Sequence, residues 1–423
     1  MKKVAWIVSA LLISGISTST MAIEVPEELN QSFLEAIKLR DEGNVFASIE
    51  LLEQLIASQP QYKRAELELA VAFYRARLYA DAQTYAKSVL SDPNTPDSVK
   101  ETIQVFLDQV TAEQEAMDKN RHRWSGSFDL GAGFDNNVNA SPDASLVNIN
   151  GNEFLLDEES ISKESKYGTI NLLGRHVYVI PGTIGLGLRP VQREWVSALN
   201  FYRKAYSEES NYNLDVITFS TGMDFISSTN WRASLAARVD AIRLGNAHLG
   251  WFKGLNGSYT MVEGVNEFTF TADITQQDYD DAANKNREGV RTGLGAEMLH
   301  QFSSTFAGKV GLNLALMNAK EDFKTYQSKS LHSGLYYTVM DDVMIYGELN
   351  YRLLDYDGVE PVYNHSRNEH QVQGVLGATY HIKEGHLADW GVGARLSGIN
   401  NTSDVSIYDY SRTDLSFNLS KQF

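Results

Sequence analysis

The stretch WRASLAARVDAI, residues 231–242, decides the fold of most of this chain. Every second residue in it is apolar or small, whereas the residues between them include Arg232, Arg238 and Asp240. This period of two is typical of a β-strand with one apolar and one wet face. The alternation recurs over 268–275 and 309–316, where Asp273, Lys309 and Asn313 belong to the polar set. We therefore expect a β-domain over residues 124–423.

Segment and connection lengths favour a membrane barrel over a soluble sandwich. The alternating segments run to roughly 10–15 residues, which matches a tilted membrane-spanning strand. Short turns at 227–230, 263–264, 303–304, 341–342 and 383–386 alternate with longer connections, namely a segment of about 30 residues after Asn136 and loops near 278–286, 320–326, 356–366 and 400–407. Two connections fit less well: 181–193 is long for the short-turn side, and 245–246 is tight for the other side.

The chain ends in DLSFNLSKQF, in which Leu415, Phe417, Leu419 and Phe423 share one parity and Lys421 interrupts it. This end resembles the closing strand of bacterial outer-membrane barrels, whose last aromatic residue is read by the barrel-assembly machinery. Counting from Ser125 predicts about 14 antiparallel strands, an even number that leaves both ends of the barrel in the periplasm. The polar parity would line a wet lumen, with the candidates Arg232, Arg238, Asp240, Asp273, Lys309 and Asn313.

Residues 23–120 carry a different, helical period of three to four. Within them, two segments repeat each other 34 residues apart: Ala36 aligns with Ala70 and Ser48 with Ala82, while Gly43 in the first inter-helix turn aligns with Arg77. A 34-residue helical hairpin resembles the tetratricopeptide repeat. The fold expected is thus α+β multidomain: a short tetratricopeptide-like α-helical domain, then a transmembrane β-barrel of about 14 strands.

Two repeats need a capping helix, which 98–110 would supply. In tetratricopeptide repeats the first helix of each pair lines a concave groove. The resemblance therefore implies that the groove exposes five candidate contacts for a partner: Arg40, Asp41, Arg64, Tyr74 and Arg75. The alternative is that the charged residues only solvate a helix face and that Tyr74 packs in the core.

Residues 1–22 resemble a cleaved secretory signal, with Lys2 and Lys3 before an apolar run and Ala22 at a small-residue site. The whole chain has a formal charge of −17 and no cysteine. An acidic balance argues against a nucleic-acid partner, and the absence of cysteine excludes thiol catalysis and disulfides. A mean hydropathy of −0.29 argues against a multi-helix membrane protein.

The segment GFDNNVN, which continues from the first β-strand, carries a family resemblance. With helical repeats before it and a 14-strand barrel after it, it looks like the surface lipoprotein assembly modulator (Slam) family. The motif residues are Gly133, Phe134, Asp135, Asn136, Asn137 and Asn139. The resemblance implies an outer-membrane translocon, with its helices in the periplasm, that moves a surface lipoprotein or secreted protein outward, in a setting such as haem or metal acquisition.

No catalytic, metal or cofactor pattern is apparent, so we expect a non-enzyme without cofactors. The expected partners are the client, membrane lipid, a periplasmic chaperone and the barrel-assembly machinery, with a monomer as the default. The client would leave through the lumen or through the seam between the first and last strands. Two rivals stay open: a polysaccharide-export porin that carries tetratricopeptide helices, and a passive outer-membrane channel.

Overall fold

The computed structural model describes residues 27–149, 151–186, 189–227, 230–245 and 247–423. The predicted signal segment 1–22 lies outside these ranges. The chain divides into two compact units, which we describe separately: a helical unit up to His122, with which the ends of three strands (179–186, 189–193 and Ser227) group, and a barrel unit formed by the rest of the described residues.

The helical unit consists of two helical hairpins and one long helix. Its helices are α2 (Glu27–Asp41), α3 (Val45–Ser58), α4 (Lys63–Arg75), α5 (Tyr79–Leu90) and α6 (Asp97–Lys119). The aligned pairs of the predicted 34-residue repeat occupy equivalent core positions: Ala36 and Ala70 are fully buried, as are Ser48 and Ala82. A small residue at each of these sites lets the two helices of a hairpin approach closely. None of the described helices has the length and apolarity that crossing a membrane requires.

The two inter-helix turns share a backbone conformation although their residues differ. Gly43 has φ +93° and Arg77 has φ +61°, so both aligned positions adopt the left-handed region. Glycine enters this region without cost, whereas arginine is strained there. The helix that follows the second hairpin is longer than predicted, since α6 continues from the expected 98–110 to Lys119. Its residues Ile103, Phe106 and Val110 complete the core of the unit.

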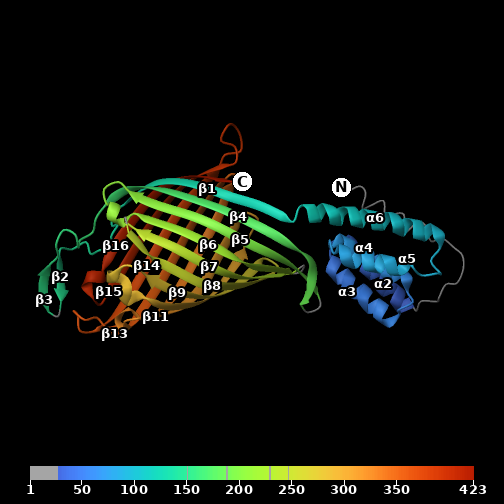
Figure 1. Cartoon of the computed structure of the whole chain (residues 1–423). Coiled ribbons are helices and arrows are strands. Elements are labelled where there is room, and N and C mark those ends of the chain that lie inside the picture. Colours follow the sequence, from blue (N-terminus) through green and yellow to red (C-terminus); the bar gives the residue numbers. More distant parts are fainter. Residues whose placement is uncertain (1–26, 150, 187–188, 228–229, 246) are drawn as a thin grey trace. The chain divides into compact units, whose positions relative to one another are not determined.

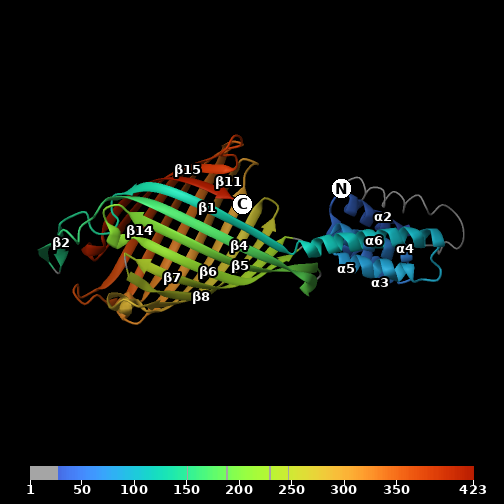
Figure 2. The same cartoon turned by 45° about the horizontal axis from the view of Figure 1, so that its top comes forward.

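The barrel unit is a closed antiparallel barrel of 14 strands, as the sequence predicts (Figures 1 and 2). The strands are β1 (His122–Asp135), β4 (Ser165–Leu186), β5 (Arg189–Tyr206), β6 (Leu214–Ser227), β7 (Trp231–Leu244), β8 (Ala247–Glu263), β9 (Asn266–Tyr279), β10 (Gly289–Gln301), β11 (Phe306–Ala319), β12 (Tyr326–Met340), β13 (Val343–Val359), β14 (Ser366–His381), β15 (Trp390–Ser403) and β16 (Tyr410–Gln422). Each strand pairs with its neighbours in sequence, and β16 pairs with β1 to close the barrel. A separate hairpin of β2 (Leu146–Ile149) and β3 (Asn152–Leu155) lies in the first long loop.

The connections alternate between two rims. The turn rim holds the tight connections such as 264–265, 302–305 and 341–342, together with the start of β1 and the end of β16. The loop rim holds 136–164 and the loops that contain η1 (Ser210–Tyr212), η2 (Ala282–Arg287), η3 (Asp322–Lys324) and η4 (Ser406–Tyr408). One expectation is wrong: 181–193 is not a long loop, because β4 extends to Leu186 and β5 starts at Arg189.

The outer face of the barrel is apolar. Large apolar side chains on the outward parity are strongly exposed, among them Leu235, Phe270, Leu294, Leu312, Leu349, Leu376 and Phe417. Lys421, which breaks this parity in β16, lies at the turn rim with its ammonium 5.6 Å from the centre of the Trp390 ring. A lysine can reach water from such a position. In a closed barrel every strand has a hydrogen-bonded neighbour on each side, so no strand edge is left unpaired inside a bilayer. This closure and the apolar exterior support an outer-membrane location.

Candidate functional site

The inner face of the barrel is identified by side chains that meet across non-adjacent strands. Tyr206 of β5 reaches Asp135 of β1 although β4 lies between them. Lys204 of β5 reaches Asp414 of β16, across both β4 and β1. Side chains of such distant strands converge only on the concave side of a curved sheet. The parity that contains Asp135 and Asp414 therefore faces the lumen.

Asp135, from the family-like motif, is the centre of a group that we call the seam cluster: Asp135, Tyr167, Lys204, Tyr206, Arg412 and Asp414. Asp135 is fully buried, and its carboxylate accepts from Arg412 Nε at 3.0 Å, from Lys204 Nζ at 3.1 Å and from the Tyr206 hydroxyl at 2.9 Å. A second Arg412 nitrogen also donates to it. Two cations and a hydroxyl together compensate the charge of this buried carboxylate.

The rest of the cluster couples the closing strand to β4 and β5. The Tyr167 hydroxyl donates to Asp414 at 2.7 Å, and Lys204 donates to the same carboxylate at 3.1 Å. The Lys204 ammonium lies 3.7 Å from the centre of the Tyr167 ring, within cation–π range. Gly133 leaves room for this arrangement, because a Cβ there would lie 2.4 Å from the Tyr167 ring. The cluster thus connects four successive strands at the seam.

The asparagines of the motif extend the seam beyond the end of β1. Asn136 accepts from the Thr413 amide at 2.6 Å through its side chain, and its own amide donates to Thr413 O at 3.1 Å. Buried Asn137 donates to Ser411 O and to Ser141 O, both at 2.8 Å. Asn139 donates to Ile161 O at 2.7 Å and accepts from the Lys163 amide at 3.1 Å. These side chains take over hydrogen bonding where the regular ladder stops.

At the opposite end of the seam, hydrogen bonds form between backbone groups, and the Phe423 ring lies over Gly126. The β1–β16 ladder runs from Ser127 opposite Gln422 to Asp135 opposite Asp414. Beyond it, Gly126 N donates to Phe423 O at 2.7 Å and Phe423 N donates to Gly126 O at 3.0 Å. The other predicted seam residues lie on the outer face: Leu419 lies opposite Leu130, Phe417 opposite Ala132 and Phe134 opposite Leu415. These residues face the membrane, whereas the seam cluster is formed by the inward-facing residues of the same strands.

The predicted lumen residues all lie on the inner face. Residues that lie directly opposite each other on adjacent strands share a face of the sheet. Such pairs connect the inward-facing Asp414 to Lys309 through Ser397, Val375, Glu348 and Gly334. It continues to the remaining candidates, and most of them form ion pairs: Arg238 with Asp240 at 2.9 Å, Asp273 with Arg291 at 2.6 Å, Lys309 with Glu348 at 3.1 Å, and Arg232 with Glu267. Asn313 contacts His332 at 3.1 Å.

Several of these inner side chains remain accessible, although Asp240 is buried. The side chain of Arg238 is 53% exposed and that of Arg232 is 57% exposed. Glu348 and Asp273 each keep about a third of their side-chain surface exposed, at 36% and 35%. The inner wall therefore keeps accessible side chains of both charges. Among the described residues, no group of His, Asp or Glu side chains has the arrangement of a metal site.

The predicted groove of the helical unit is only partly accessible. Arg40 is 2% exposed and forms a buried ion pair with Glu68 of α4, so its prediction as an exposed contact is wrong. Its position in the hairpin faces the second hairpin rather than solvent. Asp41 is exposed and lies 3.3 Å from Arg75, so these two residues form a surface ion pair. Arg64 lies 4.9 Å from the centre of the Phe33 ring.

Tyr74 is held by α6. Its hydroxyl donates to Glu113 at 2.6 Å and accepts from Gln109 at 2.6 Å, and its ring packs edge-on against Phe106. Burial and the neighbouring Glu113 carboxylate raise the pKa of Tyr74 above its ordinary value. The Tyr79 hydroxyl donates to the same carboxylate at 3.1 Å. Of the groove candidates, Asp41 and Arg64 are exposed, and Arg75 is half-buried.

A second charged group, absent from the sequence predictions, joins three loops at the loop rim. Glu360 accepts from the Tyr408 hydroxyl of η4 at 2.5 Å and from Lys324 of η3 at 3.3 Å. The Arg367 guanidinium lies 3.7 Å from the Tyr408 ring centre and 3.8 Å from that of Tyr356. Burial lowers the pKa of Lys324. The loops after β11, β13 and β15 are thereby connected to one another.

Comparison with known proteins leaves the family open. No family model matches the sequence, and no curated protein matches it. Among solved structures, the chain is similar to a FadL homologue of Pseudomonas aeruginosa, with 9% identity, 72% of this chain and 90% of that chain covered, and a TM-score of 0.37. It is also similar to Pseudomonas aeruginosa OccK1 (9%, 71% and 99%, TM-score 0.36) and Acinetobacter baumannii OccAB4 (9%, 72% and 99%, TM-score 0.36). We infer function from the residues of this chain.

Proposed function

We propose that this chain is an outer-membrane translocon of the surface lipoprotein assembly modulator type. In this proposal the helical unit lies in the periplasm and receives a client polypeptide, and the barrel lumen conducts the client to the cell surface or the medium. The client is a surface lipoprotein or a secreted soluble protein. No chemistry on the client is required, so the chain acts as a non-enzyme.

The observation that carries the proposal is the contrast between the two faces of the barrel. The outer face presents exposed leucines and phenylalanines to lipid. The inner face presents accessible arginines, carboxylates and amides, most of them in pairs of opposite charge. An unfolded polypeptide carries both signs of charge and many unsatisfied amides, so a wet wall of mixed charge lets it pass without strong attachment.

The seam supports passage through the lumen rather than between strands. β1 and β16 are paired throughout their ladder, and the seam cluster adds ion pairs at its loop-rim end. Opening this end would separate Asp135 from Arg412 and leave buried charges without partners, which costs several kcal/mol. Passage through the lumen leaves all these contacts intact.

The decisive experiment blocks the lumen chemically. Because the chain has no cysteine, Asn313→Cys introduces a single thiol on the inner wall. A bulky thiol reagent attached there should abolish surface exposure of the protein encoded beside this chain, measured by protease shaving of intact cells. Two controls should keep exposure: a small methylthiol-forming reagent at the same cysteine, and the bulky reagent on Leu312→Cys, the outward neighbour.

Solute conductance measured on the same labelled protein tests the rivals. If the bulky label abolished conductance but left client exposure unchanged, we would conclude that the chain is a passive channel. Unchanged client exposure together with loss of surface polysaccharide would make it a polymer exporter. The exit route is tested by Ser127→Cys with Gln422→Cys, which face each other across the seam. The oxidised pair should leave export unchanged, and loss of export that a reductant restores would assign the exit to the seam.

A further inference from the structure

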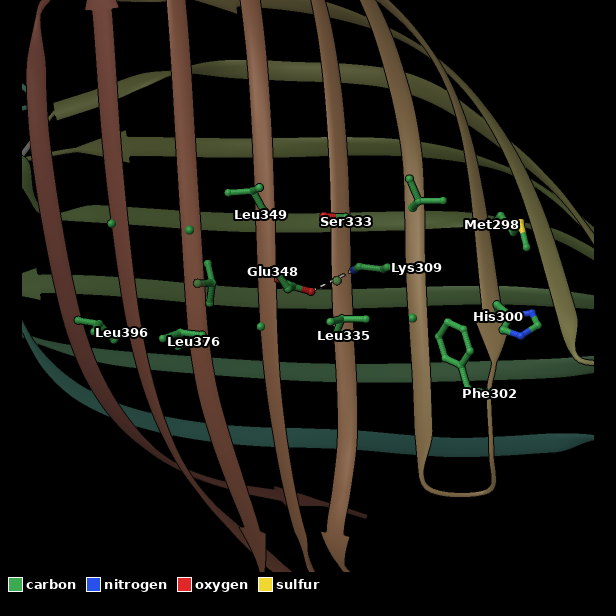
Figure 3. A pocket seen from close by; sticks show the side chains of 17 residues that line it. Met298, His300, Phe302, Lys309, Ser333, Leu335, Glu348, Leu349, Leu376 and Leu396 are labelled. Atoms are coloured by element: carbon green, nitrogen blue, oxygen red, sulfur yellow. Dashed lines mark ion pairs between the residues drawn. The ribbon is translucent and has the colours of Figure 1, made fainter.

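The lipid-facing wall of the barrel is hollowed over β11 to β15. Figure 3 shows this region, with Leu349, Leu376 and Leu396 projecting from neighbouring strands. On the outward parity between them lie residues without a large side chain. Gly308 and Gly347 both lie opposite Leu335, Gly374 lies opposite Leu349, and Gly398 lies opposite Gly374. Leu335 separates Gly308 from Gly347 and lies close to Gly308, as does the Phe302 ring, whereas Gly374 and Gly398 are open. We call the hollow lined by these four glycines the glycine groove.

The floor of the groove is open at Gly374 and Gly398. A Cβ added at either position would meet no atom within 4 Å. The two residues lie directly opposite each other on β14 and β15, so two adjacent outward positions lack any side chain. Their neighbours Leu349, Leu376 and Leu396 are 45–64% exposed and form the walls. The opening is about as wide as the spacing between neighbouring strands, ~4.8 Å.

The groove rises from the turn rim toward the middle of the apolar belt. Gly308 lies close to the start of β11, and Gly347 close to the start of β13. Gly374 and Gly398 lie near the middle of β14 and β15. Because the strands are strongly tilted (Figures 1 and 2), this diagonal leads from one membrane interface into the hydrocarbon region.

Aromatic side chains mark the turn-rim end of the groove. The Phe302 ring lies over Gly308, where an added Cβ would come within 3.0 Å of it. His300 packs edge-on against Phe302 with ring centres 4.5 Å apart, and Phe302 stacks on Phe306 at 4.9 Å. Aromatic residues gather at the headgroup level of membrane barrels. This end of the groove therefore lies where a lipid headgroup meets its acyl chains.

We propose that the glycine groove binds one acyl chain of an outer-membrane phospholipid whose headgroup lies at the turn rim beside His300 and Phe302. Lipid tails surround this face, so the ligand is always at hand. Its narrow, wholly aliphatic shape fits the open floor at Gly374 and Gly398 between the leucine walls, and toward the turn rim the chain would run beside Leu335. The gain comes from close packing, because moving a chain from lipid to protein changes its apolar contacts and not its hydration.

A second copy of the chain is the less suitable occupant. The surface of a barrel is broad and convex, so two barrels meeting here would touch at the leucine walls and leave the glycine floor empty. Such contacts also bury no surface from water inside a membrane. The proposal does not depend on what the lumen conducts, so its failure would leave the proposed translocation untouched.

The experiment fills the groove. Gly374→Leu and Gly398→Leu place side chains in open space, so neither should disturb the barrel. Gly174→Leu in β4 is the matched control, because an added Cβ there also meets nothing within 4 Å and the residue lies outside the groove. Each full-length protein is purified and reconstituted with a phospholipid that carries a photoreactive diazirine on one acyl chain. Retained heat-modifiable migration on gels verifies folding.

In the parent protein and in Gly174→Leu, crosslinks should concentrate on residues of β12 to β15. They should fall several-fold in Gly374→Leu and Gly398→Leu. Crosslinks spread evenly around the barrel, or unchanged by the two filling substitutions, would overturn the proposal. Native mass spectrometry of the same samples gives a second readout: a dimer that disappears on filling would assign the groove to a second copy instead.

Discussion

The seam between β1 and β16 is built differently at its two ends. At the loop rim, Asp135 is held by Arg412, Lys204 and Tyr206, and motif asparagines continue the hydrogen bonding past the ladder. At the turn rim, two backbone hydrogen bonds between Gly126 and Phe423 close the ladder, and among the described residues no ion pair joins β1 to β16 at this end. The difference shows that the family-like motif stabilises one end of barrel closure. Any fraying of the seam should begin at the other end.

Removing the charge of Asp135 tests the strong end most severely. Asp135→Asn preserves shape but leaves Arg412 and Lys204 without their shared carboxylate, and breaking a buried pair in this way costs about 3–5 kcal/mol. Thermal unfolding of the purified barrel in detergent should show a correspondingly lower midpoint. The control is Asp129→Asn on the same strand and face, whose carboxylate accepts from a single side chain among the described residues, that of Asn418 at 2.8 Å. If both variants lowered the unfolding midpoint equally, the seam cluster would not stabilise the loop-rim end of the seam more than the rest of the seam.

Asn137→Ala should have the next largest effect. The substitution leaves two carbonyl acceptors and the Ser141 amide without side-chain partners at a buried position, and such losses cost about 1–3 kcal/mol. Unfolding of the barrel is the readout. Asn139→Ala, which bonds within the loop and not to β16, should cost less. A larger loss in Asn139→Ala would show that the loop matters more than the seam.

Hydrogen exchange should separate the two ends without mutation. We expect the Gly126 and Phe423 amides to exchange at least about tenfold faster than the Asn136 and Thr413 amides, equivalent to about 1.4 kcal/mol of local opening. Mass spectrometry of peptides from β1 and β16 in lipid nanodiscs measures this. Similar protection at both ends would contradict the inferred fraying direction.

Phe423→Ala should change equilibrium stability least. The side chain is 76% exposed, and alanine keeps both backbone bonds to Gly126, so the change should remain within about 0.5 kcal/mol. Unfolding of the refolded protein measures stability, and the yield of folded barrel in cells measures assembly separately. A drop in yield at unchanged stability would support reading of the terminal aromatic by the assembly machinery.

Much of the fold follows from short-range pattern. The alternation of apolar and polar residues predicted the strands, the face that each side chain occupies and the even number of strands. It could do so because membrane strands must place an apolar side chain outward at every second position. The prediction for 181–193 failed because glycines and prolines there suggest a turn, whereas the strands are long enough to include them. The prediction that Arg40 is exposed failed, because a helical period alone does not show which helix face a second hairpin will cover.

The seam cluster lies beyond this kind of reasoning. The motif was visible, but the partners of Asp135 lie 69, 71 and 277 residues away in the chain. One signal could have found part of it: in a closed barrel the last strand meets the first, and Arg412 and Asp414 share the inward parity of β16. Lys204 and Tyr206 could not be placed without the curvature that brings β5 toward β1.

The position of the seam cluster in the chain has a consequence for biogenesis. Asp135 emerges early in synthesis, whereas Arg412 and Asp414 belong to the final strand. A truncated chain, or one whose last strand has not yet docked, holds an acidic group facing lysine without its arginine. Only the finished polypeptide supplies Arg412 and Asp414, so the complete set of ion pairs distinguishes a finished product from an unfinished one.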